Sequence, residues 1–217
     1  MNPGIVYVVD DDPSFRTALT RMLTATGLSV QSYASGGDLL THLSSDEDTA
    51  GPGCVLADLC MPGLDGLQLQ EACAHASVGL PFVFLTGQGD VPSAVSAMRQ
   101  GAVDFLDKCA PRHTLLAAVE RALERDANAR ASRARHEQLG RRFAGLTERE
   151  REVLEQVVHG RMNKQIAAEL GIHERTVKLH RSAITTKLGV RSVAELTTLV
   201  SQAGLFESPR QPCPEGQ

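Results

Sequence analysis

The sequence contains no tryptophan, and aromatic side chains make up only 4% of its 217 residues. Its hydrophobic cores must therefore be largely aliphatic, and a hydrophobic content of 42% is enough to build them. No apolar run approaches the roughly 20 residues that a membrane-spanning helix needs. The first residues also lack a basic segment ahead of their apolar run. We therefore expect neither a membrane span nor a secretory signal.

Cysteine is scarce and irregularly placed. The five cysteines are an odd number, and no two have the C-x-x-C spacing of a zinc site or redox motif. This pattern favours reduced thiols in a cytoplasmic protein over a disulfide framework. The cysteines are Cys54, Cys60, Cys73, Cys109 and Cys213.

The net charge of −4 is distributed unevenly along the chain. Residues 1–123 carry 6 basic and 14 acidic side chains, residues 124–143 carry 6 and 3, and residues 144–217 carry 10 and 9. The acidic first segment suits a cation site. The near-neutral last segment can bind a polyanion only if its basic groups are gathered on one face. The chain length favours two small domains over one.

Residues 1–123 alternate between strand signals and helix signals. Five short apolar runs, the first at 5–9, are separated by segments with helix-type caps, of which Asp12 followed by Pro13 is the clearest. Repeated strand–helix units with apolar strands are typical of a parallel sheet covered by helices on both faces. We predict an α/β domain with a doubly wound, five-stranded parallel sheet.

A helical pattern without proline or glycine runs from residue 112 to residue 139. Beyond Arg125 it contains alanine, arginine and glutamate with almost no large apolar groups. Residues 124–143 are therefore predicted to form a long, solvated helical linker. A coiled coil fits less well, because the heptad seam does not persist.

Residues 144–206 have the helix-capping and helix-terminating residues expected of an all-α, four-helix domain. Thr147 and Glu150 form a capping box, Asn163 is suited to cap the next helix, and glycines follow the predicted helix ends. The last segment, 207–217, contains three prolines and is predicted to be disordered.

Polar side chains follow the predicted strands of the first domain. Carboxylates come directly after the first and third strands, a threonine after the fourth and a lysine after the fifth. Because the carboxyl ends of parallel strands share one edge of a sheet, these side chains should lie together. Clustered carboxylates repel one another unless a cation lies among them, and oxygen ligands with water suit Mg²⁺. A metal and a lysine would also neutralise a phosphoryl group added to a carboxylate. The residues are Asp10, Asp11, Asp58, Thr86 and Lys108.

The segments VYVVDDDPSFR, VLADLCMPGLDGLQLQ and PFVFLTGQGDVPSAVSAMRQGAVDFLDK resemble the receiver domain of bacterial two-component response regulators, from residue 4 to about residue 123. The resemblance implies that Asp58 accepts a phosphoryl group from a sensor histidine kinase. The Mg²⁺ ligands that it implies are Asp10 (through water), Asp11, Asp58 and the carbonyl of Cys60. The switch and phosphate-pairing residues that it implies are Thr86, Phe105 and Lys108.

One residue departs from the receiver pattern. The family usually has a proline after the lysine, often joined through a cis bond, whereas Lys108 is followed by Cys109. A cis bond before a residue other than proline costs about 3 kcal/mol. The sequence therefore predicts a trans bond, a less well aimed Lys108, and slower phosphorylation or a shorter-lived phosphorylated state.

The segment LTEREREVLEQVVHGRMNKQIAAELGIHERTVKLHRSAITTKLGVRSVAEL resembles a LuxR-type helix-turn-helix domain. With the receiver, the chain resembles the FixJ–NarL class, most of all FixJ-like regulators. Residues 174–188 would be the recognition helix, with Val177, Ile184 and Leu188 toward the core. His173 stands where the family prefers a serine or threonine cap. The resemblance and the basic face imply base contacts by Lys178, Leu179 and Ser182 and phosphate contacts by Arg175, Arg181, Lys187 and Arg191.

The expected function is a phosphorylation-controlled transcription regulator rather than an enzyme. Its expected partners are double-stranded promoter DNA, a cognate histidine kinase and a second copy of the chain on phosphorylation, with RNA polymerase as a further candidate. Phosphorylation is expected to form the dimer through the helix at 92–100 and the strand at 103–106. Three alternatives are a phosphorylation-independent regulator, a phosphatase-like enzyme, and a redox sensor using Cys60 and Cys109.

Overall fold

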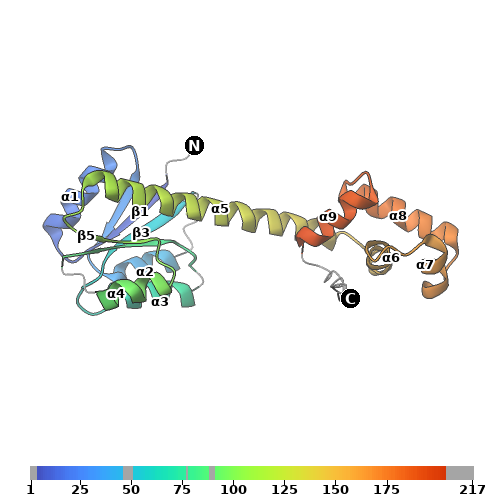
Figure 1. Ribbon diagram of the computed structural model, residues 1–217, viewed down its shortest axis with the longest axis horizontal. Coiled ribbons are helices and arrows are strands. Elements are labelled where there is room, and N and C mark those ends of the chain that lie inside the picture. The colour runs from blue at the N-terminus through green and yellow to red at the C-terminus, as the bar shows by residue number, and fades with distance from the viewer. Residues whose placement is uncertain (1–3, 46–50, 77, 88–90, 204–217) are drawn as a thin grey trace, which may run out of the picture. The chain divides into compact units, whose positions relative to one another are not determined.

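The computed structural model describes residues 4–45, 51–76, 78–87 and 91–203. They form two compact units, the first ending at Ala131 and the second beginning at Ser132 (Figure 1). The predicted disordered segment, 207–217, lies outside the described residues. The elements are β1 (Ile5–Val9), α1 (Pro13–Thr24), β2 (Ser29–Tyr33), α2 (Gly36–Ser44), β3 (Gly53–Asp58), α3 (Gly66–His75), β4 (Phe82–Thr86), α4 (Val91–Arg99), β5 (Asp104–Asp107), α5 (Arg112–Ala144), α6 (Glu148–Val158), α7 (Asn163–Leu170), α8 (Glu174–Leu188) and α9 (Val193–Ala203).

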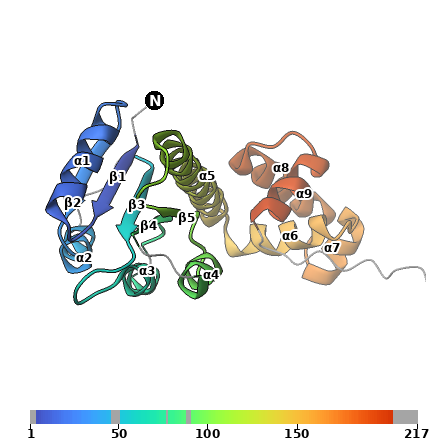
Figure 2. The ribbon, with the colours of Figure 1, turned by 60° about the vertical axis from the view of Figure 1, so that its left-hand side comes forward.

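The first unit is built on a five-stranded parallel sheet with the strand order β2-β1-β3-β4-β5. Helices cover both faces of this sheet (Figure 2). One core joins the sheet to α1 and α5, and the other joins it to α2, α3 and α4. The predicted doubly wound α/β fold is confirmed. Its strand order reverses beside β1, so β1 and β3 end next to each other at the edge where such sheets bind ligands.

Helix α5 continues without interruption from the first unit into the second. The prediction that the helix is solvated beyond Arg125 is wrong for Asp126, which is only 1% exposed. Its carboxylate accepts hydrogen bonds from the backbone N–H of Gly53 at 2.8 Å and from Nε of Arg130 at 2.6 Å. These bonds hold the start of the predicted linker against the sheet.

The second unit is a small bundle of α6, α7, α8 and α9, and the last residues of α5 contribute to its core. The predicted capping box at Thr147 and Glu150 is confirmed. The prediction that Asn163 caps α7 is wrong, because the N-cap is Met162. The Asn163 side chain is instead hydrogen-bonded to Arg181. Over the part of the chain that the structure describes, no helix is long and apolar enough to cross a bilayer.

Candidate functional site

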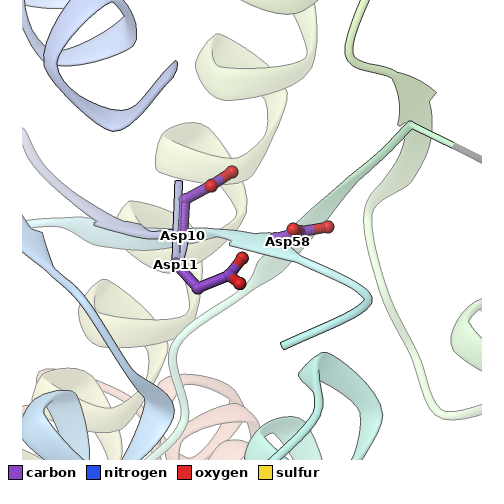
Figure 3. Close-up of side chains that lie close together, drawn as sticks. All are labelled: Asp10, Asp11 and Asp58. Atoms are coloured by element: carbon purple, nitrogen blue, oxygen red, sulfur yellow. The ribbon is translucent and has the colours of Figure 1, made fainter. Parts of the chain in front are cut away.

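Three carboxylates meet at the carboxyl ends of β1 and β3. Asp10 and Asp11 directly follow β1, and Asp58 is the last residue of β3. One oxygen atom from each carboxylate lies within 4.8 Å of the others (Figure 3). Asp10 and Asp58 are buried, whereas Asp11 is exposed. The cluster thus consists of two buried carboxylates and one that is open to solvent.

Lys108 lies between the two buried carboxylates. Its Nζ is 2.7 Å from Oδ2 of Asp10 and 2.9 Å from Oδ2 of Asp58. The Lys108–Cys109 peptide bond is trans, as the sequence predicted. With this trans bond, Lys108 still reaches both buried carboxylates. The backbone N–H of Lys108 donates to the carbonyl of Thr86 at 2.8 Å, and this bond helps to fix the lysine without a proline.

The pKa values at this site reflect burial and charge pairing. Burial raises the pKa of Asp10 above its ordinary value, although its bonds with Lys108 and the Asp12 N–H oppose the shift. Burial acts to lower the pKa of Lys108, but hydrogen bonds to Asp10 and Asp58 outweigh it and raise that pKa. Lys108 is therefore a cation at neutral pH. Three clustered carboxylates, one of them open to solvent, offer the oxygen ligands that Mg²⁺ prefers.

The other predicted site residues lie on β4, on β5 and in the loop after β3. Thr86 ends β4 and is buried, and Phe105 lies in β5, partly buried against the core beneath α2, α3 and α4. Cys60 follows β3 in an exposed loop, and its backbone N–H donates to Oδ1 of Asp58 at 3.2 Å.

Sequence reasoning missed three residues that shape the site. The Phe15 ring lies 4.6 Å from Nζ of Lys108, which is within the range of a cation–π contact. Arg16 donates a hydrogen bond to the backbone carbonyl of Asp10. Gly66 packs so closely that an added Cβ would lie 2.5 Å from the carbonyl oxygen of Asp58, so only glycine fits there. The only signal for Gly66 was its place directly after Asp65, the N-cap of α3.

The described cysteines differ sharply in exposure. Cys54 and Cys73 are buried, which raises the pKa of their thiols to about 12 and about 11. Cys60 and Cys109 are exposed and lie in the loops that follow Asp58 and Lys108. Only this second pair is accessible for the redox alternative.

A second candidate site lies on α8. Gly171, in the left-handed conformation with φ 64°, ends α7 and leads into the turn before α8. Val177, Ile184 and Leu188 are buried as predicted. His173 is the N-cap of α8 and makes no capping hydrogen bond through its side chain. The exposed side chains of α8 include Arg175, Lys178, Leu179 and Ser182.

Three predicted DNA-contacting side chains have partners within the domain, the first being Lys178, whose Nζ lies 3.5 Å from Oε1 of Glu174. Arg181 donates to Oδ1 of Asn163 at 2.8 Å, which joins α8 to α7. Lys187 donates to the buried carboxylate of Glu150 at 2.7 Å, which joins α8 to α6. Arg191 is exposed, and its backbone N–H donates to Glu195. The structure thus gives Arg181 and Lys187 roles in holding the helices together.

Comparisons with known families agree with this architecture. Residues 6–120 match the family model of the response regulator receiver domain, and residues 144–200 match that of bacterial regulatory proteins of the luxR family. Fold and site together define a receiver joined to a helix-turn-helix DNA-binding domain. The chain belongs to the two-component response regulators of this type, which are transcription regulators rather than enzymes.

The similarity extends over nearly the whole chain. Nodulation protein W of Bradyrhizobium diazoefficiens is 39% identical over 93% of this chain and 87% of its own length. Transcriptional regulatory protein FixJ of Azorhizobium caulinodans is 38% identical over 92% of this chain and 93% of its own. Among solved structures, the response regulator StyR has a TM-score of 0.83 and 42% identity, covering 92% of this chain and 99% of its own.

Proposed function

We propose that the protein is a transcriptional response regulator that a sensor histidine kinase activates by phosphorylating Asp58. The observation that carries this proposal is that an oxygen of Asp58 lies within 4.8 Å of oxygens of both other carboxylates, while its Oδ2 is 2.9 Å from Nζ of Lys108. Asp10 is likewise buried and accepts a hydrogen bond from the backbone N–H of Asp12, so the choice of Asp58 as acceptor rests on its place in the matched receiver domain.

The site residues have separable roles in this proposal. Asp10, Asp11, Asp58 and the Cys60 carbonyl would hold Mg²⁺, which supplies positive charge beside the phosphoryl oxygens. An oxygen of Asp58 attacks the phosphorus of a phosphohistidine, and the histidine nitrogen leaves with the bonding electron pair. Lys108 then exchanges its bond with Asp58 for one with a phosphoryl oxygen. Thr86 and Phe105 would follow this change as the switch pair.

The proposed response is dimerisation through α4 and β5. Val95 is 44% exposed and Met98 is 48% exposed on α4, and both are large apolar side chains. They line a shallow, mostly apolar depression together with Ala94 and Arg99. Exposed apolar surface of this kind is typical of an interaction face.

The proposed DNA-binding element is α8, placed in a major groove. Lys178, Leu179 and Ser182 would contact bases, and Arg175 and Arg191 would contact phosphates. Arg181 and Lys187 would contact phosphates while they keep their bonds to Asn163 and Glu150. Two copies would bind adjacent half-sites of a promoter, with RNA polymerase as a further partner in the cytoplasm. Residues 1–123, 124–143 and 144–206 would serve as receiver, linker and DNA-binding domain.

The test compares DNA binding and mass with and without beryllofluoride, a phosphoryl mimic. DNA sites are first selected by the protein from a random pool. The treated protein should double its sedimenting mass and bind the selected DNA more tightly, while Asp58→Asn should do neither. Met98→Glu should keep phosphoryl uptake but remain a monomer, because a charge enters the apolar face. An unchanged monomer that binds DNA equally well in both states would overturn the proposal.

A further inference from the structure

The aromatic ring of Phe15 lies against the ammonium group of Lys108. Nζ of Lys108 lies over the face of this ring, 4.6 Å from its centroid, and the Lys108 side chain is only 18% exposed. At this distance the negative face of an aromatic ring attracts a cation, and the attraction is stronger where water is largely excluded. The ring is therefore a further partner of the ammonium, beside the carboxylates of Asp10 and Asp58.

One turn of the chain positions both Asp10 and Phe15. The backbone N–H of Asp12 donates to Oδ1 of Asp10 at 2.9 Å. Asp12 is also the N-cap of α1, and its Oδ1 accepts a hydrogen bond from the backbone N–H of Phe15 at 3.3 Å. The Phe15 side chain is partly buried against the core that joins the sheet to α1 and α5. The capped start of α1 therefore holds the ring beside the carboxylate cluster.

The ring attracts Lys108 without adding a negative charge to the site. Three carboxylates already meet there, and a phosphoryl group brings further negative charge. A fourth carboxylate in place of the ring would hold the lysine but would repel the phosphoryl group. In the proposed reaction Lys108 leaves Asp58 for a phosphoryl oxygen, and a neutral partner can hold the ammonium in place during this exchange.

We propose that Phe15 is a positioning residue, whose ring holds the ammonium of Lys108 beside Asp58 and so prepares it to meet the incoming phosphoryl group. Phe15 acts through Lys108, since its side chain has no group that binds phosphoryl oxygens or a metal. A cation that is already in place lowers the barrier more than one that must be ordered during the reaction. The effect on phosphorylation rests on the proposed function, whereas the contact between the ring and the ammonium does not.

The test weakens the attraction of the ring for a cation while almost preserving its shape. Phenylalanine with one, two or three ring fluorines replaces Phe15 alone in the full-length protein, because each fluorine reduces the negative charge on the ring face. Urea unfolding, followed by the fluorescence of Tyr7 and Tyr33, measures the stability of the first unit. We expect the unfolding equilibrium constant to rise with each fluorine, by about three- to ten-fold for three fluorines.

Phosphorylation is measured on the same series. With acetyl phosphate and Mg²⁺, the rate should fall with each fluorine, by about three- to ten-fold for three fluorines. Lys108→Met is the matched background, since methionine keeps an aliphatic side chain but carries no cation. Phosphorylation should be slower throughout in that background, and neither the rate nor the stability should fall with fluorine number.

The sign of the stability change separates a cation contact from simple packing. Fluorine makes the ring more apolar, so a ring that only packs in the core should stabilise the unit or leave it unchanged as fluorines are added. The wild-type series therefore decides between the two even if Lys108→Met fails to fold.

Two results would overturn the proposal. One is a stability that stays constant or rises with fluorine number, or that falls equally in Lys108→Met. The other is a stability that falls while the phosphorylation rate stays constant, which would give the ring a purely structural role. If the unsubstituted protein takes up no phosphoryl group, the proposed function itself fails, and the stability series still decides whether the ring holds Lys108.

Discussion

The carboxylate of Asp126 accepts a hydrogen bond from the backbone N–H of Gly53, 73 residues earlier in the sequence. Gly53 is the first residue of β3, and Asp58 is the last. Asp126 therefore anchors α5 to the strand that ends in the proposed phosphoryl acceptor. The linker helix consequently begins as part of the receiver, and the first unit extends to Ala131.

We expect Asp126→Ala to destabilise the receiver by about 1–3 kcal/mol, because it leaves the buried N–H of Gly53 without an acceptor. Asp126→Asn should cost less, since it keeps an acceptor oxygen. Tyr7 and Tyr33 are the only tyrosines and the chain has no tryptophan, so tyrosine fluorescence during urea unfolding reports on this unit alone. Glu124→Ala, exposed on the same helix, should change stability by less than about 0.5 kcal/mol. Equal stability of Asp126→Ala and wild type would show that this bond does not anchor α5.

A Mg²⁺ ion at the proposed site would compete with Lys108 for the same carboxylates, since Lys108 bonds to both Asp10 and Asp58. We expect Lys108→Gln to bind Mg²⁺ about three- to ten-fold more tightly, because a positive charge leaves the site. Calorimetric titration with Mg²⁺ measures the affinity, and Lys164→Gln on α7 is the control for a lost positive charge elsewhere. An unchanged or weaker affinity of Lys108→Gln would argue against a shared site.

The Glu150–Lys187 bond makes the stability of the second unit depend on pH. The hydrogen bond from Lys187 is the largest cause that lowers the pKa of Glu150 below its ordinary value of 4.5. A carboxyl with a lowered pKa in the folded state stabilises the protein above about pH 4.5, and this contribution is lost as the pH falls through the folded-state pKa.

Calorimetric unfolding between about pH 6 and about pH 3 should show this loss in the wild type. The loss should be smaller in Glu150→Gln, which cannot ionise. Glu148→Gln removes an exposed carboxyl of the same helix and should follow the wild type. Parallel pH profiles for the wild type and Glu150→Gln would contradict the proposed linkage.

Lys178 and Arg175 should affect DNA binding in different ways. Lys178→Ala should reduce discrimination between the selected site and scrambled DNA by about 1–3 kcal/mol, because it removes a base contact. Arg175→Ala should weaken binding to both DNAs alike and lower the salt slope by about 1. Fluorescence anisotropy across a salt series measures both quantities. If both variants weaken the two DNAs equally, Lys178 contacts only phosphate.

Much of this architecture could be predicted from local sequence. The apolar runs predicted the strands of the sheet, and the acids that follow two of these runs predicted the cluster of Asp10, Asp11 and Asp58. Helical spacing placed Val177, Ile184 and Leu188 in the core of the second unit. These features depend on periodicity and chain direction, which short segments reveal.

Contacts between distant segments could not be predicted in the same way. The pattern beyond Arg125 is polar, and only the fold brings Asp126 to Gly53. Asn163 has the residue type of a cap, but Arg181 of the next helix engages its side chain. The backbone hydrogen bond from Lys108 to Thr86 joins two neighbouring strand ends, and the local sequence does not reveal it.

The most direct test of the account is to locate the phosphoryl group. The full-length protein is incubated with Mg²⁺ and acetyl phosphate, and peptide mass spectrometry follows trapping of the acyl phosphate with hydroxylamine. We predict one Mg²⁺-dependent modification, on Asp58, that is absent from Asp58→Asn although that variant keeps the wild-type unfolding transition. A phosphoryl group that remains on Asp58→Asn, or that maps to another residue in the wild type, would contradict the account.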